Sequence, residues 1–372
     1  MKIAFVSGNR EQLPDAVVPL GLLYVMQSCP DRHDKVLWDL CFEQAPEEAL
    51  AERLRAYQPD VVAVGMRNVQ NNDYSGIRDN VTYYRSLVET VRAHSDASVV
   101  LGGGGFSVMP AELMDEIRPD FGVAGEGEAV FPRLLEVIAG EGDGGSSLPG
   151  VYAWEGERLS STPRGDAFLD IDALPVPDRR VVDQRYYERF GIESVQTKRG
   201  CSLSCEYCTY PTIEGRAVRR RTPKRVVDEL FDLVAQHEQT KHLFIVDSVF
   251  NLPRSHAMAV CTEMIERGWS LPWTCYANPI GFDEPLARRM AEAGCVGMEI
   301  GSDSGCDEVL RALNKGFDAP SIRRMHQVAK RVGIKDCHSF MVGTPSETLD
   351  HVRRTLDFIV DLEPFCACLL YT

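Results

Sequence analysis

The segment SVQTKRGCSLSCEYC, residues 194–208, joins the start of an apolar strand to a loop with three cysteines in eight residues. Cys201, Cys205 and Cys208 follow the spacing C-x3-C-x2-C. Thiolates are the usual ligands of iron–sulfur clusters, and three of them hold three irons of a [4Fe–4S] cube. The fourth iron then stays open to a small chelating ligand. Zinc is the alternative, but structural zinc takes four protein ligands and no histidine lies in this loop.

Strands and helices alternate from this segment to the end of the chain. We expect strands at 194–200, 242–250, 273–279, 295–303, 337–343 and 365–371, and helices at 223–237, 256–267, 284–294, 319–333 and 348–362. Such alternation is typical of a parallel sheet, and six units predict a partial (β/α)6 barrel of the TIM type. The cysteine loop then follows the first strand, at the end where such barrels place their chemistry. The last strand has no covering helix, so we expect either a truncated C-terminus or another element at that edge.

The first 140 residues also alternate. We expect strands at 2–8, 35–41, 60–66, 98–105 and 121–128, and helices at 19–29, 46–58, 83–95 and 110–118. This α/β pattern predicts a doubly wound parallel sheet of the flavodoxin-like type, with its ligand beyond the carboxyl ends of the strands. The glycine-rich runs 102–105 and 125–128 lie at two such ends, although each is also compatible with a plain tight turn. The fingerprint G-x-G-x-x-G is absent after the first strand, which argues against a nicotinamide cofactor.

The chain thus divides into a doubly wound domain (1–140), a linker with a small hairpin (141–192) and a partial barrel (193–372). The net charge of −15 disfavours a nucleic-acid partner. The sequence has no apolar run long enough to span a membrane and no secretion signal, so we expect a cytoplasmic protein with reduced thiols. We interpret the other nine cysteines as small buried hydrophobic residues: Cys29, Cys41, Cys261, Cys275, Cys295, Cys306, Cys337, Cys366 and Cys368.

These motifs resemble the cobalamin-dependent radical S-adenosylmethionine (SAM) enzymes. The pattern C-x3-C-aromatic-x-C is literal, and the segments 244–251, 297–305 with 314–316, and 340–348 are similar to family motifs at later strands. The resemblance implies that the three cysteines hold the cluster and that SAM is bound by Tyr207, Asp247, Ser248, Glu299, Ser304 and Gly343. The usual glycine-glycine-glutamate element is not literal, so the contact to the amino group of SAM falls on Asp247 and Ser248.

The N-terminal half resembles the cobalamin-binding domain that precedes many such enzymes. The implied cobalamin-binding residues are Leu20, Gly21, Arg67, Asn68, Gly102, Gly103, Gly104, Gly125, Glu126, Gly127 and Glu128. The pattern D-x-H-x-x-G is absent after the first strand, so no histidine ligand is expected below cobalt. Arg67, after the third strand, is expected to face the cobalt instead, where its charge would disfavour a coordinated water. A surface or salt-bridged arginine is the alternative.

The activity implied is C-methylation of a small molecule, with a natural-product or amino-acid scaffold. The cluster would cleave SAM, methylcobalamin held between the domains would deliver the methyl group, and a flavodoxin or ferredoxin would supply electrons. Tyr276 and His338 are weak candidates for substrate contact and acid–base chemistry, because both lie on barrel strands. Two other functions stay open. One is a rearrangement, ring contraction or cyclisation with the same cofactors, and the other is a non-catalytic corrinoid or cluster carrier.

Overall fold

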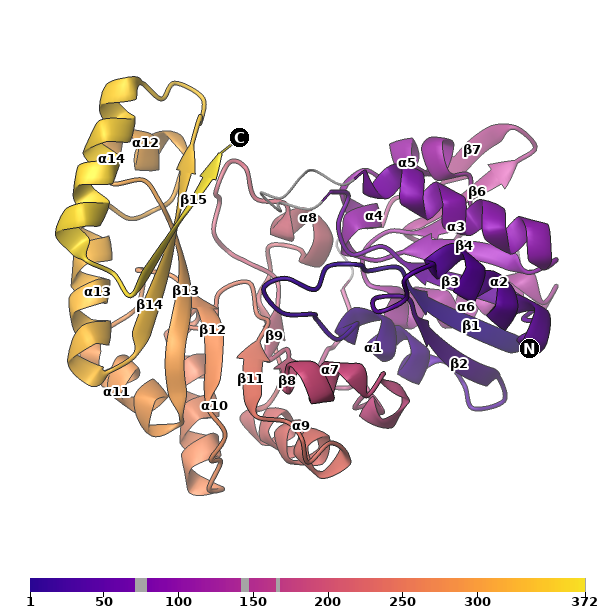
Figure 1. Ribbon diagram of the computed structural model, residues 1–372, viewed down its shortest axis with the longest axis horizontal. Helices are drawn as coiled ribbons and strands as arrows, with labels where there is room; N and C mark the ends of the chain where they lie inside the picture. The colour runs from indigo at the N-terminus through magenta and orange to yellow at the C-terminus, as the bar shows by residue number, and fades with distance from the viewer. Residues whose placement is uncertain (71–78, 142–146, 165–167, 372) are drawn as a thin grey trace. The chain divides into compact units, whose positions relative to one another are not determined.

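The structure is a computed structural model that describes residues 1–70, 79–141, 147–164 and 168–371 (Figure 1). Its internal contacts divide the chain into two units, Met1–Phe190 with Thr212–Gly215, and Gly191–Pro211 with Arg216–Thr372. Part of the turn-rich segment expected in the linker, 142–146, lies outside the described residues. No helix among those described is long and apolar enough to cross a membrane.

The first unit contains a seven-stranded sheet in the order β2-β1-β3-β4-β5-β6-β7. Its five parallel strands are β1 (Lys2–Ser7), β2 (Asp34–Asp39), β3 (Val61–Gly65), β4 (Ser98–Gly102) and β5 (Phe121–Val123). Strand order reverses between β1 and β3, as in flavodoxin-like folds, so the predicted doubly wound sheet is confirmed. The carboxyl ends of the five strands therefore lie along one edge of the sheet.

Helices cover both faces of this sheet. They are α1 (Leu20–Ser28), α2 (Pro46–Tyr57), α3 (Asn80–His94), α4 (Gly104–Val108), α5 (Pro110–Ile117) and α6 (Gly127–Ile138). On one face Phe5 of β1 packs edge-to-face against Phe131 of α6, and on the other Leu54 and Leu87 join the core. The sequence did not predict α6, which contains Pro132, a residue that usually breaks a helix interior.

A hairpin of β6 (Val151–Glu155) and β7 (Arg158–Ser161) extends the same sheet, because β6 pairs antiparallel with β5. The hairpin was expected, but within a linker. The physical reason for the difference is that β5 would otherwise leave a row of unpaired backbone groups at the sheet edge. The following η2 (Arg179–Val181) and α7 (Arg185–Arg189) also belong to this unit, where the Tyr186 hydroxyl donates to Asp39 over 3.0 Å.

The second unit contains six parallel strands in the order β15-β14-β13-β12-β11-β8. The strands are β8 (Ile192–Val195), β11 (His242–Ile245), β12 (Trp273–Ala277), β13 (Cys295–Asp303), β14 (Lys335–Val342) and β15 (Cys366–Tyr371). Each strand pairs with the next one along the chain, which confirms the partial (β/α)6 barrel. A short ribbon of β9 (Lys198–Arg199) and β10 (Arg219–Arg220) frames the cysteine loop.

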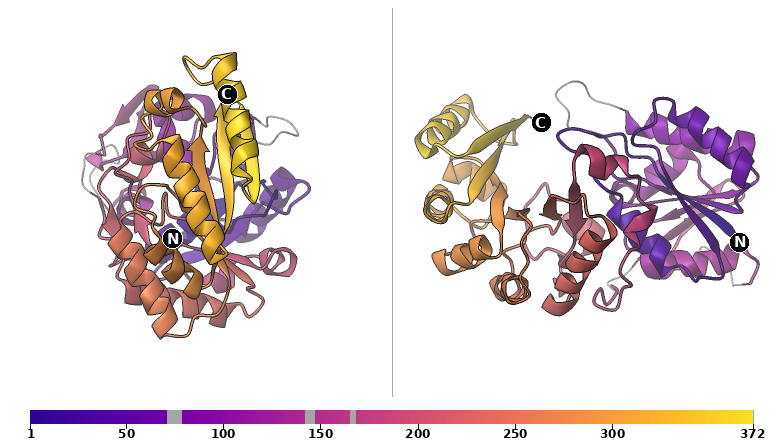
Figure 2. Two further views of the ribbon diagram at one scale, coloured as in Figure 1. Left: turned by 90° about the vertical axis from the view of Figure 1, so that its left-hand side faces the viewer. Right: turned by 60° about the horizontal axis from the view of Figure 1, so that its bottom comes forward.

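One face of this second sheet is covered by helices (Figure 2, left, orange and yellow). They are α9 (Pro223–Gln236), α10 (Arg254–Glu266), α11 (Glu284–Glu292), α12 (Asp307–Ala312), α13 (Ala319–Val332) and α14 (Leu349–Leu362), and the short α8 (Tyr210–Glu214) follows the cysteine loop. We call the opposite side of the sheet the inner face.

Candidate active site

The three cysteines of the C-x3-C-x2-C loop lie between β9 and α8. Cys201 is buried and Cys205 and Cys208 are half-buried, and all three thiols are free. Burial raises the pKa of the Cys205 and Cys208 thiols, while the nearby Lys315 ammonium opposes this rise at both. Three soft sulfur ligands on one irregular loop, with a cation beside them, fit a [4Fe–4S] cluster that keeps one iron free for another ligand.

Asp247 does not have the role that the sequence assigned to it. Its carboxylate is fully buried and accepts hydrogen bonds from the Thr197 amide (2.7 Å), the Thr197 hydroxyl (2.5 Å) and the Lys198 amide (3.2 Å). The Lys198 ammonium lies 3.9 Å away. Because this carboxylate is fully buried and bonded to Thr197 and to Lys198, the first residue of β9, Asp247 anchors the approach to the cysteine loop and is closed to SAM in this structure.

Of the other proposed SAM residues at strand ends, Ser248 and Gly343 are accessible to a ligand and Ser304 is buried. Ser248 donates to the Gly200 carbonyl over 3.3 Å, and Gly343 is exposed after β14 with a φ of +93°. Ser304 differs from the expectation, because it is fully buried and its hydroxyl bonds to the Thr355 hydroxyl (2.9 Å) and the Cys306 amide (3.1 Å). Ser304 therefore fastens the end of β13 to α14 and is unavailable to a ligand.

His338 is also placed differently from the sequence interpretation, which put it inside the barrel. It points toward the helices, is fully buried, and bonds to Ser302 Oγ through Nδ1 (2.6 Å) and to Asp336 Oδ2 through Nε2 (2.9 Å). His326 Nδ1 lies 2.6 Å from the same carboxylate oxygen. Since this network is satisfied and closed to solvent, His338 is not an acid–base candidate.

The inner face instead carries a row of side chains from neighbouring strands. Tyr276 pairs with Glu299, which pairs with Cys337, so all three lie side by side on one face. Tyr276 is 38% exposed, and its ring packs edge-to-face on Phe244 with centroids 5.1 Å apart. Partial desolvation by the surrounding sheet raises the pKa of the Glu299 carboxyl.

Three cysteines on this side contradict the interpretation of all nine as buried hydrophobic residues. Cys337 is half-buried. Its register partner on the edge strand, Cys366, is exposed, and so is Cys368, which pairs with Ser339. Only Cys29, Cys41, Cys261, Cys275, Cys295 and Cys306 are buried as expected. The difference arises because β14 and β15 present apolar residues on both faces, so the sequence pattern does not distinguish inward from outward positions.

A buried group beside the cysteine loop escaped the sequence analysis. The Tyr207 hydroxyl donates to Asp303 Oδ2 over 2.5 Å, and Lys315 Nζ lies 2.6 Å from the same oxygen and 2.9 Å from the tyrosine oxygen. Asp303 and Lys315 are both almost fully buried. Lys315 lies in the quoted segment 314–316, but no local pattern links it to Asp303, twelve residues earlier.

The proposed cobalamin residues of the first unit lie at the carboxyl edge of its sheet. Gly103 has a φ of +102°, and a Cβ there would lie 2.5 Å from the Met66 carbonyl oxygen. A Cβ on Gly105 would lie 2.9 Å from the Asn68 amide nitrogen. The glycines after β4 thus allow this turn to pack against the segment after β3, whereas a Cβ on Gly21 would meet nothing within 4 Å.

Arg67 and Asn68 are exposed after β3, and Arg67 forms no ion pair within the described parts of the chain. Of the two alternatives to an arginine that faces cobalt, a surface position fits this exposure, and a salt bridge has no support among these residues. The turn after β5 is held by the chain itself, since the Gly125 amide donates to Ser107 Oγ (2.8 Å) and Glu126 accepts from the Leu169 amide (3.1 Å). Glu128 is buried in the first turn of α6.

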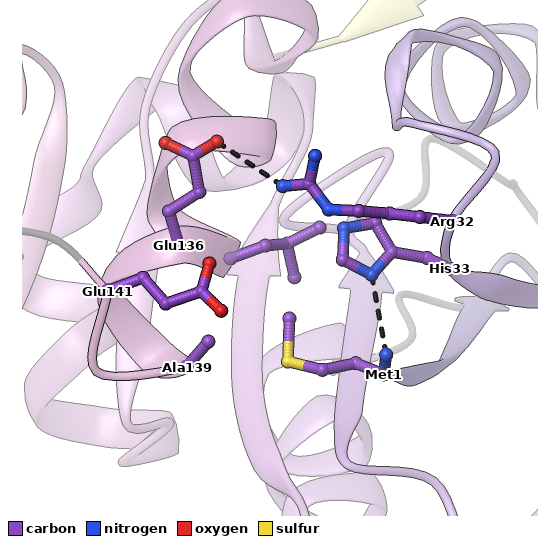
Figure 3. A pocket seen from close by; sticks show the side chains of 7 residues that line it. Met1, Arg32, His33, Glu136, Ala139 and Glu141 are labelled. Carbon is purple, nitrogen blue, oxygen red and sulfur yellow. Dashed lines mark hydrogen bonds and ion pairs between the residues drawn. The ribbon is translucent and has the colours of Figure 1, made fainter.

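A separate cavity of about 170 Å³ lies at the opposite, amino-terminal edge of the same sheet (Figure 3). It is lined in part by Met1, Arg32, His33 and Glu136, with Arg32 bonded to Glu136 over 3.4 Å. Ligands of doubly wound sheets bind at the carboxyl edge. This cavity is therefore not the site that the glycine-rich turns form.

Together these features define a class, namely a barrel with a cluster-binding loop joined to a doubly wound cofactor domain. Comparison with known families agrees. The Radical SAM superfamily matches residues 195–359 and the B12 binding domain matches residues 8–135. An uncharacterised methyltransferase of Pyrococcus horikoshii is 25% identical over 98% of this chain and 78% of its own length. Tryptophan 2-C-methyltransferase of Streptomyces laurentii is 28% identical over 97% of this chain and 70% of its own length.

Solved structures agree as well. The radical SAM methyltransferase TsrM of Kitasatospora setae, with tryptophan and a SAM analogue bound, superposes with a TM-score of 0.90 at 27% identity, over 99% of this chain and 72% of TsrM. TsrM with cobalamin and a [4Fe–4S] cluster gives a TM-score of 0.86. The chain belongs to the cobalamin-dependent radical SAM methyltransferase family. It is an enzyme that uses a [4Fe–4S] cluster, SAM and cobalamin to methylate carbon in a small molecule.

Proposed function

We propose that this methyltransferase acts on a flat aromatic substrate, with the indole of tryptophan as the first candidate. The observation that carries the proposal is the aromatic pair Phe244–Tyr276 on the inner face, beside the carboxyl of Glu299. Two perpendicular rings offer edge and face contacts to a third ring. Tryptophan is the substrate named for the relative from Streptomyces laurentii and is bound in the TsrM structure.

Glu299 would offer the substrate a polar contact beside the aromatic pair. It sits between Tyr276 and Cys337 on adjacent strands, and Gly297 and Gly301 flank it on the same face. Glycines leave the carboxyl accessible to a ligand amine or ring N–H. Since the pKa of Glu299 is raised, the carboxyl is also suited to exchange a proton with such a group.

The chain's own residues would hold the cofactors as follows. Cys201, Cys205 and Cys208 would ligate the cluster, and Tyr207, Ser248 and Gly343 remain the proposed SAM contacts. Glu299, predicted as a SAM contact from the sequence, is assigned to the substrate instead. Leu20, Gly21, Arg67, Asn68 and the turns after β4 and β5 remain the proposed cobalamin contacts. When bound, these groups supply one-electron reduction and methyl transfer, and the protein positions them.

An electron donor of the flavodoxin or ferredoxin type and a cytoplasmic location complete the proposal. The support is chemical, because the three cysteines must be reduced in order to ligate a cluster, and thiols stay reduced in the cytosol. Addition of reduced flavodoxin in place of a chemical reductant is expected to sustain turnover.

The test is anaerobic reconstitution with iron, sulfide and cobalamin, followed by incubation with tryptophan and SAM that carries a deuterated methyl group. We expect a product heavier by one labelled methyl, detected by mass spectrometry. A product that is rearranged but carries no label would contradict methylation, and a reconstituted protein that consumes no SAM would indicate a carrier. Label transfer to other planar rings but not to tryptophan would keep the aromatic class and reject the specific candidate.

The aromatic contact has its own test. Tyr276→Ala is expected to lower kcat/KM for the aromatic substrate by tenfold or more. This corresponds to a loss of about 1.4 kcal/mol of transition-state stabilisation. Tyr276→Phe keeps the ring and should retain most activity. Tyr57→Phe is the matched control, because Tyr57 lies at the amino edge of the first sheet, bonded to Asp34. Equal losses in the Tyr276→Ala and Tyr57→Phe variants would refute the role of Tyr276.

A further inference from the structure

The segment Leu313–Lys315 contacts the cysteine loop at three successive positions. Asn314 Nδ2 donates to the Ser204 carbonyl over 2.8 Å, and the Glu206 amide donates to the Leu313 carbonyl over 3.2 Å. Lys315 Nζ reaches the Tyr207 hydroxyl over 2.9 Å. The residues between the cluster cysteines are thus bonded to a segment more than a hundred residues later in the chain.

The third contact is a buried charge pair. Lys315 Nζ lies 2.6 Å from Asp303 Oδ2, and the side chains of both residues are only 4% exposed. Two rings border the ammonium, since Nζ lies 5.3 Å from the Tyr207 ring centroid and 5.5 Å from that of Phe317. Burying two charges costs several kcal/mol per ion, and well-packed apolar residues often give equal stability. A contribution to stability alone therefore does not explain this pair.

We propose that Lys315, paired with Asp303, holds the cysteine loop in its ligating conformation and raises the reduction potential of the iron–sulfur cluster. The inference rests on the proposed ligation of that cluster by Cys201, Cys205 and Cys208. Reduction adds one electron to the cluster, so a nearby cation favours the reduced form. At low effective dielectric such a charge acts more strongly than it would at a solvated surface.

The two charges of the pair act in opposite directions. Both reach the cysteine loop at Tyr207, which lies between Cys205 and Cys208 in the sequence: the Tyr207 hydroxyl accepts from Lys315 Nζ over 2.9 Å and donates to Asp303 Oδ2 over 2.5 Å. Removal of Lys315 leaves Asp303 uncompensated beside the cluster, while removal of the Asp303 charge leaves the cation alone. The two changes must then move the potential in opposite directions.

The experiment is a redox titration of the reconstituted full chain, with the reduced cluster measured by EPR and iron measured separately. Lys315→Met is expected to lower the equilibrium constant for reduction at least tenfold, which is about 59 mV for one electron. Asp303→Asn is expected to raise it, and the double variant should lie between the two. Arg216→Met is the matched control, because exposed Arg216 also contacts this loop, at Leu203 and Ser204, but is screened by water.

The outcomes separate the two proposals. Wild-type protein that binds no iron refutes cluster ligation itself. If wild type binds iron but the equilibrium constant for reduction of Lys315→Met stays within twofold of the wild-type value, the role of Lys315 is refuted. If Lys315→Met cannot retain iron, Asp303→Asn and the double variant decide, and a potential in Asp303→Asn that is unchanged or lowered overturns the proposal. A purely structural pair would reduce iron content in the single variants without opposite shifts.

Discussion

Replacement of Asp247 by alanine should loosen the strands that lead into the cysteine loop, even without any cofactor. The buried carboxylate accepts three hydrogen bonds from Thr197 and Lys198 and lies 3.9 Å from the Lys198 ammonium. Hydrogen bonds to charged groups contribute about 1.5–3 kcal/mol each, and removal of one partner of a buried ion pair costs about 3–5 kcal/mol. Because these terms overlap, we expect a loss of about 3–5 kcal/mol.

Hydrogen exchange of the cofactor-free full chain measures this loss locally. Amides of β8 and β11, which do not donate to Asp247, should exchange at least about a hundredfold faster in Asp247→Ala, since each 1.4 kcal/mol is about tenfold. Ser248→Ala is the matched control. It removes one hydrogen bond of 3.3 Å and should change exchange by about tenfold at most. Exchange within threefold of wild type in Asp247→Ala, together with lost SAM affinity, would refute the anchoring role.

Three further predictions concern the first unit. Gly103→Ala should destabilise it by about 2–4 kcal/mol, through positive φ and the clash with Met66, while Gly21→Ala should change stability by less than about 1 kcal/mol in chemical denaturation. Burial raises the pKa of Asp39 to about 6, above its unfolded value, so the fold favours the protonated acid. The free energy of unfolding should then fall by about 3 kcal/mol from about pH 4 to about pH 6, and Asp39→Asn should remove that fall; equal pH profiles would contradict the assignment. Arg67→Leu should retain cobalamin but increase water-coordinated cobalt in the EPR spectrum of cob(II)alamin, and an unchanged spectrum would argue against its placement below the cobalt.

Much of the fold could be predicted, because strongly periodic segments carry their own signal. The strand Cys295–Asp303 and the helix beginning at Pro223 match their predicted positions within a residue. The helix Gly127–Ile138 was missed because its start reads as a glycine-rich turn and Pro132 interrupts its pattern. The hairpin at 151–161 was found, but its pairing partner, β5, is a long-range choice that no local pattern specifies.

The site was less predictable, since it depends on which face each residue occupies. The pairing of β13 is irregular at both of its ends. Its register with β12 shifts between Trp273 and Thr274, and its register with β14 shifts between Gly301 and Asp303. Counting alternate residues therefore fails to place Ser304, which faces α14. The His338 side chain lies on the helix-covered face of the sheet, because Asp336 bonds both His338 and His326 of α13. The cysteine spacing needed no such information, because all three ligands lie on one loop.

The most direct test of the account is a cofactor count on the anaerobically reconstituted full chain, for wild type and for the triple variant Cys201→Ala, Cys205→Ala, Cys208→Ala. We predict cluster iron and bound cobalamin in the wild type, and cobalamin without cluster iron in the triple variant, whose first unit is unchanged. Equal iron in both proteins, or wild type that binds no cobalamin, would contradict the account.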